Sequence, residues 1–464
     1  MRNLLILFLL SSVLIDQSCY PVRAYRLASP VVTIDNGITL AFIEFDDNGE
    51  LYDERKDAND LKSILERKEL DQTIQKIQDL KESNKATGIN VVVFVHGWKN
   101  NAGDSNNVAG FQAFLRQIHN SYADDQQRAP LMGIYIGWRG ASVRVAKNFS
   151  YWSRTNAALR VAGPHMEEAL YRIIHAVKSS QTGLTRSASI PEPKDSQSVD
   201  QTQTSNLILI GHSFGARVVE KAMTSYFENK ILDFDGKHLQ GCIAPPGSGA
   251  DKGRLTKEGQ IVSGWQRQTP DLTVLLNEAA PATHAKQFLE FLKCHGTVLL
   301  RAGEHFPLFL SITSDGDAAT SIALPIGQAV ARIELKTRAY GGSSDPPEIA
   351  NQSTYYTHSA ANIPALHSHE LRSGPCLDGE KAVPFAKSIL DRYSLCEVHY
   401  SGSTPYWNHT PYWITKIPVS IVPDHSDIFH PELYGFLSAF LPDKESLRSP
   451  MNPPVQRTRT LSVQ

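Results

Sequence analysis

Three features that would identify common protein classes are missing from this chain. None of its five cysteines forms a C-x-x-C pair, so neither a zinc-finger type of metal site nor a thioredoxin-like redox site is supported. No G-x-G-x-x-G motif or P-loop follows an expected strand, which disfavours a nucleotide-binding α/β protein. A basic stripe and an acidic tail are also absent, and the formal net charge is -2, so we expect no nucleic-acid partner.

Little of the chain is apolar enough to cross a membrane. The apolar run at its start, residues 4–15 (LLILFLLSSVLI), is too short to span a bilayer comfortably. It has the length of the apolar core of a signal peptide, and Val22-Arg23-Ala24 offers a small-residue cleavage site. We therefore expect residues 1–24 to be a signal peptide and the protein to be exported. A buried N-terminal strand or helix is the alternative.

The cysteines bear on how an exported chain would be held. Cys19 suggests that the exported protein is attached to a membrane by a lipid on this residue. The preceding residues 16–18, however, depart from the usual bacterial lipoprotein pattern. Secreted, periplasmic and lipid-anchored forms therefore all stay open. Cleavage after Ala24 leaves four cysteines, an even count that permits disulfides. Cys376 and Cys396 share one Gly- and Pro-rich segment and are the pair that we favour. Four unpaired thiols are the alternative.

The remaining composition is that of a globular protein. Hydrophobic residues make up 41% of the 464 positions, which excludes collagen-like and wholly disordered chains and suffices for a large core. No internal repeat of solenoid length occurs. Length alone allows two or three domains, and equally one enlarged α/β domain with insertions.

Short apolar runs alternate with longer amphipathic stretches. Expected strands cover residues 31–34, 38–45, 91–95, 131–136, 207–210, 272–276, 307–313 and 417–422, with a turn at 35–37. Expected helices cover residues 60–85, 106–122, 152–177, 213–228, 283–293 and 431–441. Strand-then-helix alternation at this spacing predicts an α/β protein with a mostly parallel central sheet flanked by helices.

One pentapeptide lies at a strand-to-helix junction. Gly211-His212-Ser213-Phe214-Gly215 matches G-x-S-x-G and follows the strand LILI directly. In that context the serine occupies a sharp, strained turn that lifts its hydroxyl above the sheet. Gly211 and Gly215 are needed because larger side chains would clash with neighbouring chain. The helix N-terminus favours negative charge nearby, so Ser213 is the candidate nucleophile.

A second element, His96-Gly97-Trp98, directly follows the strand VVVFV. Together with the pentapeptide it resembles the α/β-hydrolase superfamily, in particular its esterase- and lipase-like members. The resemblance implies that the backbone N–H groups of Trp98 and Phe214 form an oxyanion hole, that Gly97 belongs to the oxyanion loop, and that His96 holds that loop. The segments 136–140 and 151–152 also resemble a group of poorly characterised bacterial hydrolases.

The acid of the triad is expected between the serine and the histidine in the chain. The strand PLFLSIT is followed by two aspartates, Asp315 and Asp317. The resemblance favours Asp317, through its S-x-x-D spacing and the Ala-Ala-Thr that follows, while Asp315 stays open. One of the two is in any case a turn or N-cap residue. Glu278, after the strand LTVLL, is a weaker candidate in what looks like a structural turn.

A histidine just after the last strand is the superfamily's position for the general base. His425 follows the expected strand IPVSIV, and His430 is the alternative. An imidazole titrates close to working pH, so it can take the serine proton and return it to the leaving group. Ser213, Asp317 and His425 each follow an expected strand, and the carboxyl ends of parallel strands form the edge where ligands bind.

Two other groups are interpreted as structural. His367, His369 and Glu370 form an H-S-H-E cluster, but no third spaced ligand or matching helix accompanies it, so we expect exposed polar side chains and no metal. Arg139 is able to bind a substrate carboxylate or phosphate, although a structural ion pair is the commoner role of such an arginine.

These residues predict a serine hydrolase that cleaves carboxylic esters through a Ser213, His425 and Asp317 triad and an acyl-enzyme intermediate. The expected substrate is a small-molecule or lipid ester, and no cofactor is needed. Thioesters and amides are open to the same triad. The alternative from another class is a catalytically inactive hydrolase fold that serves as a binding or surface protein.

The expected domain organisation follows from the resemblance and from local composition. One hydrolase domain covers residues 25–448. Residues 179–205, rich in Ser, Gln, Thr and Pro, are a flexible insert within it. Residues 339–411 lie between the acid and the histidine, are rich in Pro, Gly and aromatic residues, and are expected to form a cap over the site. Residues 449–464 are expected to be a disordered tail.

Overall fold

The structure is a computed structural model of the chain. It describes residues 29–34, 37–52, 69–85, 87–98, 100–103, 105–121, 129–138, 151–179, 205–235, 269–295, 307–325, 352–383, 392–398, 411–438 and 440. The expected signal peptide with Cys19, Arg139, residues 180–204 of the expected insert, and the tail all lie outside these residues.

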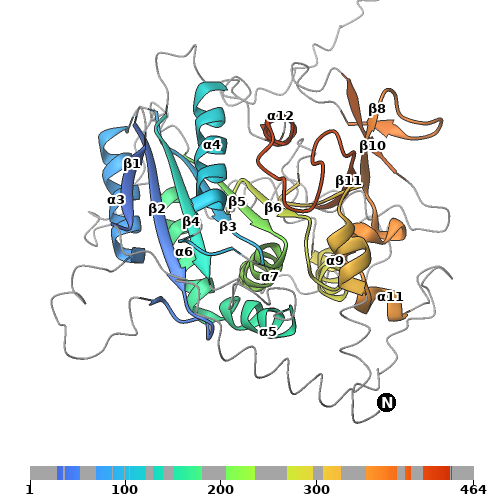
Figure 1. Cartoon of the computed structure of the whole chain (residues 1–464), viewed down its shortest axis with the longest axis horizontal. Helices are drawn as coiled ribbons and strands as arrows, with labels where there is room; N and C mark the ends of the chain where they lie inside the picture. Colours follow the sequence, from blue (N-terminus) through green and yellow to red (C-terminus); the bar gives the residue numbers. More distant parts are fainter. Residues whose placement is uncertain are drawn as a thin grey trace, which may run out of the picture.

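An 11-stranded sheet forms the centre of the described part of the protein (Figure 1). The strands are β1 (Val31–Ile34), β2 (Ile38–Phe45), β3 (Asn90–Val95), β4 (Leu131–Trp138), β5 (Asn206–His212), β6 (Leu272–Leu276), β7 (Phe309–Ser314), β8 (His369–Ser373), β9 (Lys381–Ala382), β10 (Tyr393–Glu397) and β11 (Tyr412–Ile417). Their order across the sheet is β1-β2-β4-β3-β5-β6-β7-β11-β8-β10-β9.

Most of this sheet is parallel. All neighbouring pairs from β2 across to β8 run parallel, whereas β1 at one edge and β10 and β9 at the other pair antiparallel. β3 and β4 are buried almost throughout, because helices cover both faces of the sheet. The predicted α/β class, with a mostly parallel central sheet flanked by helices, is confirmed.

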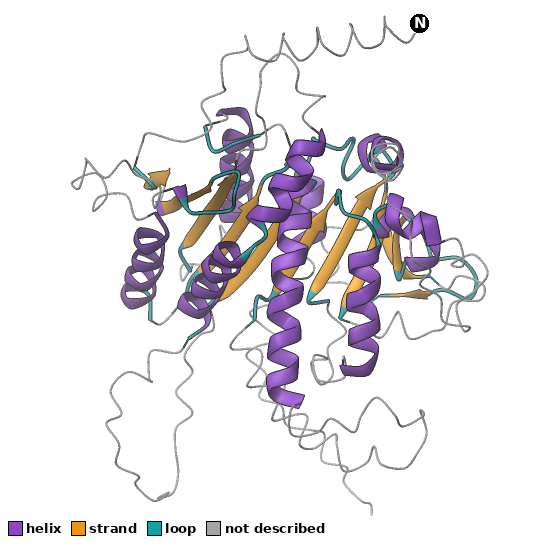
Figure 2. Cartoon of the chain, turned by 90° about the horizontal axis from the view of Figure 1, so that it is seen from below, coloured by secondary structure: helices purple, strands orange, loops and turns teal. Residues whose placement is uncertain are grey.

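Helices lie on both faces of the sheet (Figure 2), and a hydrophobic core lies between the sheet and the helices on each face. The helices are α3 (Glu69–Ser83), α4 (Ser105–Ser121), α5 (Tyr151–Val161), α6 (Pro164–Lys178), α7 (Phe214–Asp235), α9 (Thr283–His295), α11 (Gln352–Thr357) and α12 (Pro431–Ser438). One core joins the sheet to α3, α5, α6, α7 and α9, and the other joins it to α4 and α12. Along β3, Val93 points into the first core and Phe94 into the second, as strand alternation requires.

The expected single helix over residues 152–177 is wrong. Two helices, α5 and α6, replace it, and the break falls at Ala162 and Gly163. Pro164 is the cause, because it has no N–H to donate and its ring clashes with the preceding helical turn. It occupies the first turn of α6, where a missing N–H costs nothing.

The last strand is also placed differently from the expectation. β11 ends at Ile417, where residues 417–422 were expected to form the strand. Pro418 cannot donate to a sheet neighbour, and the chain turns there, with the N–H of Ile421 donating to the Pro418 carbonyl oxygen (3.0 Å). The apolar residues after Pro418 have the sequence pattern of a strand, but they belong to a turn. His425 therefore follows β11 through a longer loop than expected.

The described part of residues 339–411 adds strands to the sheet, and the expected cap over the site stays a prediction, because residues 339–351, 384–391 and 399–410 lie outside the described residues. β8 pairs parallel with β11, and β10 pairs antiparallel with β8. A disulfide joins Cys376 to Cys396, which confirms the pairing favoured from the sequence. Glu380 lies close to both sulfur atoms, but a disulfide offers no thiolate to a metal ion.

Candidate active site

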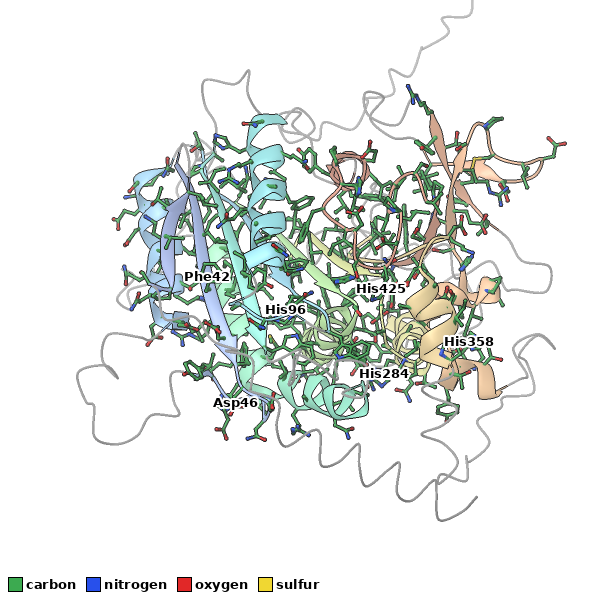
Figure 3. All side chains as sticks on the ribbon, in the orientation of Figure 1. Phe42, Asp46, His96, His284, His358 and His425 are labelled. Carbon is green, nitrogen blue, oxygen red and sulfur yellow. A yellow bond between two sulfur atoms is a disulfide. The ribbon has the colours of Figure 1, made fainter. Side chains whose placement is uncertain are left out.

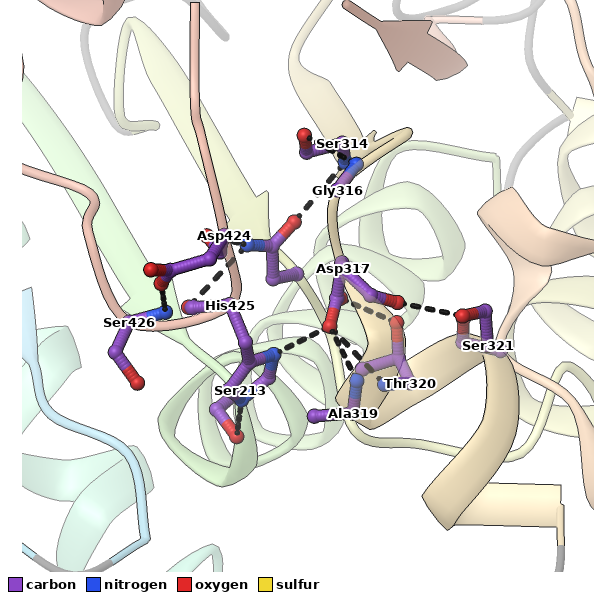
Figure 4. A network of polar contacts seen from close by, with 12 residues as sticks. Ser213, Ser314, Gly316, Asp317, Ala319, Thr320, Ser321, Asp424, His425 and Ser426 are labelled. Atoms are coloured by element: carbon purple, nitrogen blue, oxygen red, sulfur yellow. Dashed lines mark hydrogen bonds and ion pairs between the residues drawn. The ribbon is translucent and has the colours of Figure 1, made fainter. Parts of the chain in front are cut away.

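Ser213 lies at the carboxyl end of β5, at the turn into α7 (Figure 4). Its φ is 56°, a left-handed conformation that costs a residue with a side chain about 1–2 kcal/mol. The end of β6 holds the serine in this conformation. The Ser213 N–H donates to the carbonyl oxygen of Leu276 (3.0 Å), and its carbonyl oxygen accepts from the N–H of Ala279 (3.2 Å). The strained turn that the pentapeptide predicts is therefore present.

The two glycines of the pentapeptide let this turn lie against neighbouring backbone. A Cβ atom on Gly211 would be 2.5 Å from the Cα of Ala216, and one on Gly215 would be 2.2 Å from the carbonyl oxygen of Val95. Non-bonded carbon and oxygen atoms do not approach so closely. Only glycine fits at either position, and as a result the start of α7 packs directly on the end of β3.

His425, which is labelled in Figure 3, lies between Ser213 and Asp317 (Figure 4). Its Nε2 is 2.8 Å from Ser213 Oγ, and its Nδ1 is 2.8 Å from Asp317 Oδ1. Because an ionised carboxylate only accepts hydrogen bonds, we assign the ring proton to Nδ1, which leaves the Nε2 lone pair to accept from the serine hydroxyl. Three residues far apart in the chain thus form one continuous line of hydrogen bonds.

Asp317 is buried and its carboxylate is well provided with donors. Oδ1 accepts from His425 and from the backbone N–H groups of Ala319 and Thr320 (both 3.1 Å), and Oδ2 accepts from the Thr320 hydroxyl. Burial alone would raise the pKa of Asp317, but the hydrogen bonds from His425 and Thr320 outweigh it and lower that pKa below its ordinary value. The carboxylate therefore stays ionised and orients the imidazole.

The alternative acid, Asp315, and the alternative base, His430, lie outside this line of hydrogen bonds. Asp315 is about half exposed and forms an ion pair with Lys416 at 2.9 Å. His430 is one-third exposed and contacts Asp427, with Nε2 2.5 Å from a carboxylate oxygen. Of the two aspartates, Asp317 is the one that the structure brings to His425.

Glu278 belongs to an interior group of side chains. It is buried beside Glu220 of α7, and burial, reinforced by the Glu220 carboxyl group and opposed by Arg217, raises the pKa of Glu278 well above its ordinary value. Glu220 also accepts a hydrogen bond from the hydroxyl of Tyr412 (3.2 Å). Glu278 is thus placed with Glu220 and not in the line of hydrogen bonds that ends at Ser213.

His96 fixes the loop that follows β3. Its ring is fully buried and lies parallel to the Trp138 ring, with the ring centres 5.7 Å apart. The Trp138 backbone N–H donates to His96 Nε2 (3.0 Å), so the ring proton is on Nδ1, which donates to the carbonyl oxygen of Gly97 (2.9 Å). These contacts match the structural role that the resemblance implies for His96.

Gly97 and Trp98 lie next to Ser213. A Cβ atom on Gly97 would be 2.7 Å from Ser213 Cβ, so the backbone of this loop passes directly beside the serine. The rings of Trp98 and Phe214 meet edge to face, with their centres 6.3 Å apart. The two residues expected to supply the oxyanion hole are therefore neighbours at the site.

The two histidines of the H-S-H-E cluster are buried, and the expectation that they are exposed is wrong. His367 and His369 are 5% and 1% exposed, because the insertion of β8 beside β11 covers them. The ring of His369 stacks on Trp413, with ring centres 3.8 Å apart, and Glu370 accepts a hydrogen bond from Arg372 (2.7 Å). Within the cluster, His367 Nδ1 lies 3.5 Å from a carboxylate oxygen of Glu370, whereas His369 turns to Trp413 instead.

Two further residues, Thr320 and Asn277, contact the proposed triad. Thr320 donates to Asp317 from both its backbone and its side chain. Asn277, at the end of β6, adopts the left-handed conformation (φ 46°) and directs its side-chain amide at the carbonyl oxygens of Asp424 and His425. An asparagine directly after a buried strand was the only available signal, since asparagine tolerates positive φ.

Comparisons with known proteins return no match for this chain: none with a protein-family model, none with a curated protein and none with a solved structure. The functional proposal therefore depends on the residues and their geometry.

Proposed function

We propose that this chain is a serine hydrolase with the α/β-hydrolase fold, and that it cleaves carboxylic esters with Ser213 as nucleophile, His425 as general base and Asp317 as the orienting acid. The observation that carries the proposal is the line of hydrogen bonds from Asp317 through His425 to Ser213, each 2.8 Å long. The strained strand-to-helix turn at Ser213 supports it independently.

The first half of the proposed reaction acylates the enzyme. Ser213 Oγ attacks the ester carbonyl carbon while His425 Nε2 takes the hydroxyl proton. The ring then carries a positive charge, which the buried Asp317 carboxylate stabilises through Nδ1–H. The tetrahedral intermediate breaks its bond to the alcohol oxygen, and Nε2–H gives that oxygen the proton it needs to leave.

The second half releases the acid. His425 takes a proton from a water molecule, whose oxygen attacks the acyl carbon, and the ring then returns the proton to Ser213 Oγ as the acyl bond breaks. The backbone N–H groups of Trp98 and Phe214 are the proposed donors to the negative oxygen in both halves. Their residues flank Ser213, and removing one such donor typically costs about a hundredfold or more in rate.

We also propose that the protein is exported, either secreted or periplasmic after cleavage of residues 1–24, or held by a lipid on Cys19 after cleavage just before that residue. The Cys376 to Cys396 disulfide supports this, because disulfides persist in oxidising compartments and are rare in the cytosol. Within the described part of the chain, no helix has both the length and the apolar character needed to cross a bilayer. The proposed partner is a small-molecule or lipid ester.

Ester turnover by purified protein tests the proposed function. The full mature chain should hydrolyse short-chain p-nitrophenyl esters, and Ser213→Ala should abolish turnover while leaving the melting temperature near that of the wild type. Ser83→Ala, which removes an exposed hydroxyl at the end of α3, is the matched control and should retain activity. A folded wild type without turnover on esters would instead favour an inactive fold that binds its ligand.

A further inference from the structure

The backbone carbonyl oxygen of His425 accepts hydrogen bonds from two side chains. His212 Nε2 lies 2.7 Å from this oxygen, and Asn277 Nδ2 lies 3.3 Å from it. Neither donor touches the imidazole nitrogens of His425, which are already engaged by Ser213 and Asp317. The two donors therefore act on the backbone that carries the proposed base.

His212 is suited to this contact because it is neutral. Burial, reinforced by the charge of the nearby His425, lowers the pKa of His212 to about 3. A carbonyl oxygen only accepts, so the ring proton of His212 is on Nε2. Its Nδ1 is buried without a hydrogen-bond partner in the described structure, against Gly97, where a Cβ atom would be 3.0 Å from it. His212 thus spans from the loop after β3 to the His425 loop.

Asn277 joins three parts of the site through one side chain and one backbone amide. Its backbone N–H donates to the carbonyl oxygen of Ile312 (2.8 Å), and its Oδ1 accepts from the N–H of Ser314 (3.1 Å), so it is fixed to β7. Its Nδ2 is then left to reach the carbonyl oxygens of Asp424 (3.4 Å) and His425 (3.3 Å). The left-handed backbone of Asn277 is what turns the side chain toward that loop.

The loop that carries His425 is also held by the Ser314 hydroxyl, which donates to the carbonyl oxygen of Val422, and by Asp424 Oδ1, which accepts from the N–H groups of Ser426 (2.7 Å) and Asp427 (2.9 Å). Of these contacts, none is made to residue 425 itself, whereas His212 and Asn277 bond its carbonyl oxygen directly.

The side chains of Pro423, Asp424, Ser426 and Asp427 are exposed, and Asp424 is drawn beside His425 in Figure 4. A catalytic imidazole must meet both Ser213 and Asp317 at hydrogen-bond distance, and a misplacement of about 1 Å typically costs about a hundredfold in rate. A fixed carbonyl at residue 425 restricts the imidazole to the geometry observed.

We propose that His212 and Asn277 are positioning residues, which hold the backbone of His425 so that its ring bridges Ser213 and Asp317. This inference rests on the proposed function, since it assigns their role to the same reaction. Neither residue exchanges a proton with substrate. Both act through His425, from the nucleophile strand β5 and the neighbouring strand β6.

Substitutions that remove only the donor test the proposal in the full mature chain. Asn277→Asp keeps the shape, the tolerance for positive φ and the acceptor for Ser314, but turns an oxygen toward the carbonyls of residues 424 and 425. His212→Leu removes the second donor, and His212→Gln keeps an amide donor at about the same reach. We expect Asn277→Asp and His212→Leu to lower kcat about a hundredfold with KM within twofold, and His212→Gln to restore most of the loss.

A spectroscopic readout separates this proposal from the proposed function. The proton shared by His425 Nδ1 and Asp317 should give a low-field proton resonance, which Asp317→Asn abolishes. We expect Asn277→Asp and His212→Leu to lose or broaden this resonance at unchanged melting temperature, and His212→Gln and the exposed-site control Asp427→Asn to keep it. Resonance and kcat unchanged in both donor-removing variants would overturn the proposal. If the wild type turns over no ester, the proposed function fails, while the resonance still decides the positioning role.

Discussion

Gly215 lies so close to Val95 that a Cβ atom on the glycine would be 2.2 Å from the valine's carbonyl oxygen. This contact joins the first turn of α7, which follows the proposed nucleophile, to the end of β3, which precedes the proposed oxyanion loop. The distance between the two proposed halves of the catalytic machinery is therefore set by a backbone contact that only glycine permits.

We therefore expect Gly215→Ala to destabilise the fold much more than the addition of one methyl group would suggest. Because the obstructing atom belongs to backbone, α7 must move away from β3, and we expect a loss of about 3 kcal/mol in the free energy of unfolding together with loss of esterase activity. Urea denaturation measures the first. Gly374→Ala is a suitable control, since that glycine has positive φ but nothing within 4 Å of its Cβ position, and should cost only about 1–2 kcal/mol. Equal stability losses in the two variants would contradict the packing argument.

Asp317 and Asp315 are two residues apart and should behave differently. Asp317→Asn removes the acceptor that keeps the His425 ring proton on Nδ1, and we expect kcat for ester hydrolysis to fall about ten-thousandfold. Asp315→Asn breaks only an exposed pair with Lys416 and should leave kcat within twofold of the wild type. Steady-state kinetics on one p-nitrophenyl ester measures both. A larger effect at Asp315 would show that the triad acid is misassigned.

The burial of His212 predicts an acid-sensitive stability. Its folded-state pKa of about 3 is lower than the ordinary value of 6.5, so between these values the unfolded chain binds a proton that the folded chain does not. Stability is therefore lost as pH falls from about 6.5 toward 3, by up to about 1.4 kcal/mol per pH unit for this group. Urea unfolding of wild type and His212→Gln at pH 7 and pH 4.5 measures it. The wild type should lose more stability than the variant, and equal losses would exclude His212 as the cause.

The buried pair of Glu278 and Glu220 predicts the opposite dependence of stability on pH. Burial raises the pKa of Glu278 well above 4.5, so as pH rises above 4.5 the unfolded chain releases a proton that the folded chain retains. The folded state loses stability over that range. Glu278→Gln is neutral at all pH values and should therefore melt higher than the wild type at pH 8 but not at pH 4. Glu82→Gln, at an exposed position, should change the melting temperature little at either pH. A Glu278→Gln variant that melts lower at pH 8 would contradict this.

Local sequence patterns were sufficient to predict those features that depend only on residues within one strand or one turn. The β-branched runs of β3 and β5 and the glycines of the pentapeptide predict strands and a turn from neighbouring residues alone. The pairing of Asp317 with His425 required the resemblance to a known family, because two aspartates follow the same strand and only tertiary contact distinguishes them.

Other features could not be predicted from local pattern. The apolar residues after Pro418 resemble a strand, yet proline ends the sheet pairing at Ile417. The burial of His369 depends on the pairing of β8 with β11. These two strands are not adjacent in the sequence, so no local pattern indicates that they pair. The role of Asn277 depends on three partners from β7 and the His425 loop, and an asparagine after a strand does not indicate which side chains will surround it.

Covalent labelling of Ser213 is the most direct test of the central claim. The full mature chain is treated with a fluorophosphonate probe, and the labelled residue is identified by peptide mass spectrometry. A triad of the proposed kind predicts one adduct, on Ser213, which forms far more slowly in His425→Ala and not at all in Ser213→Ala. A folded wild type that is not labelled, or that is labelled at another residue while Ser213 stays unmodified, would contradict the assignment of Ser213 as the nucleophile.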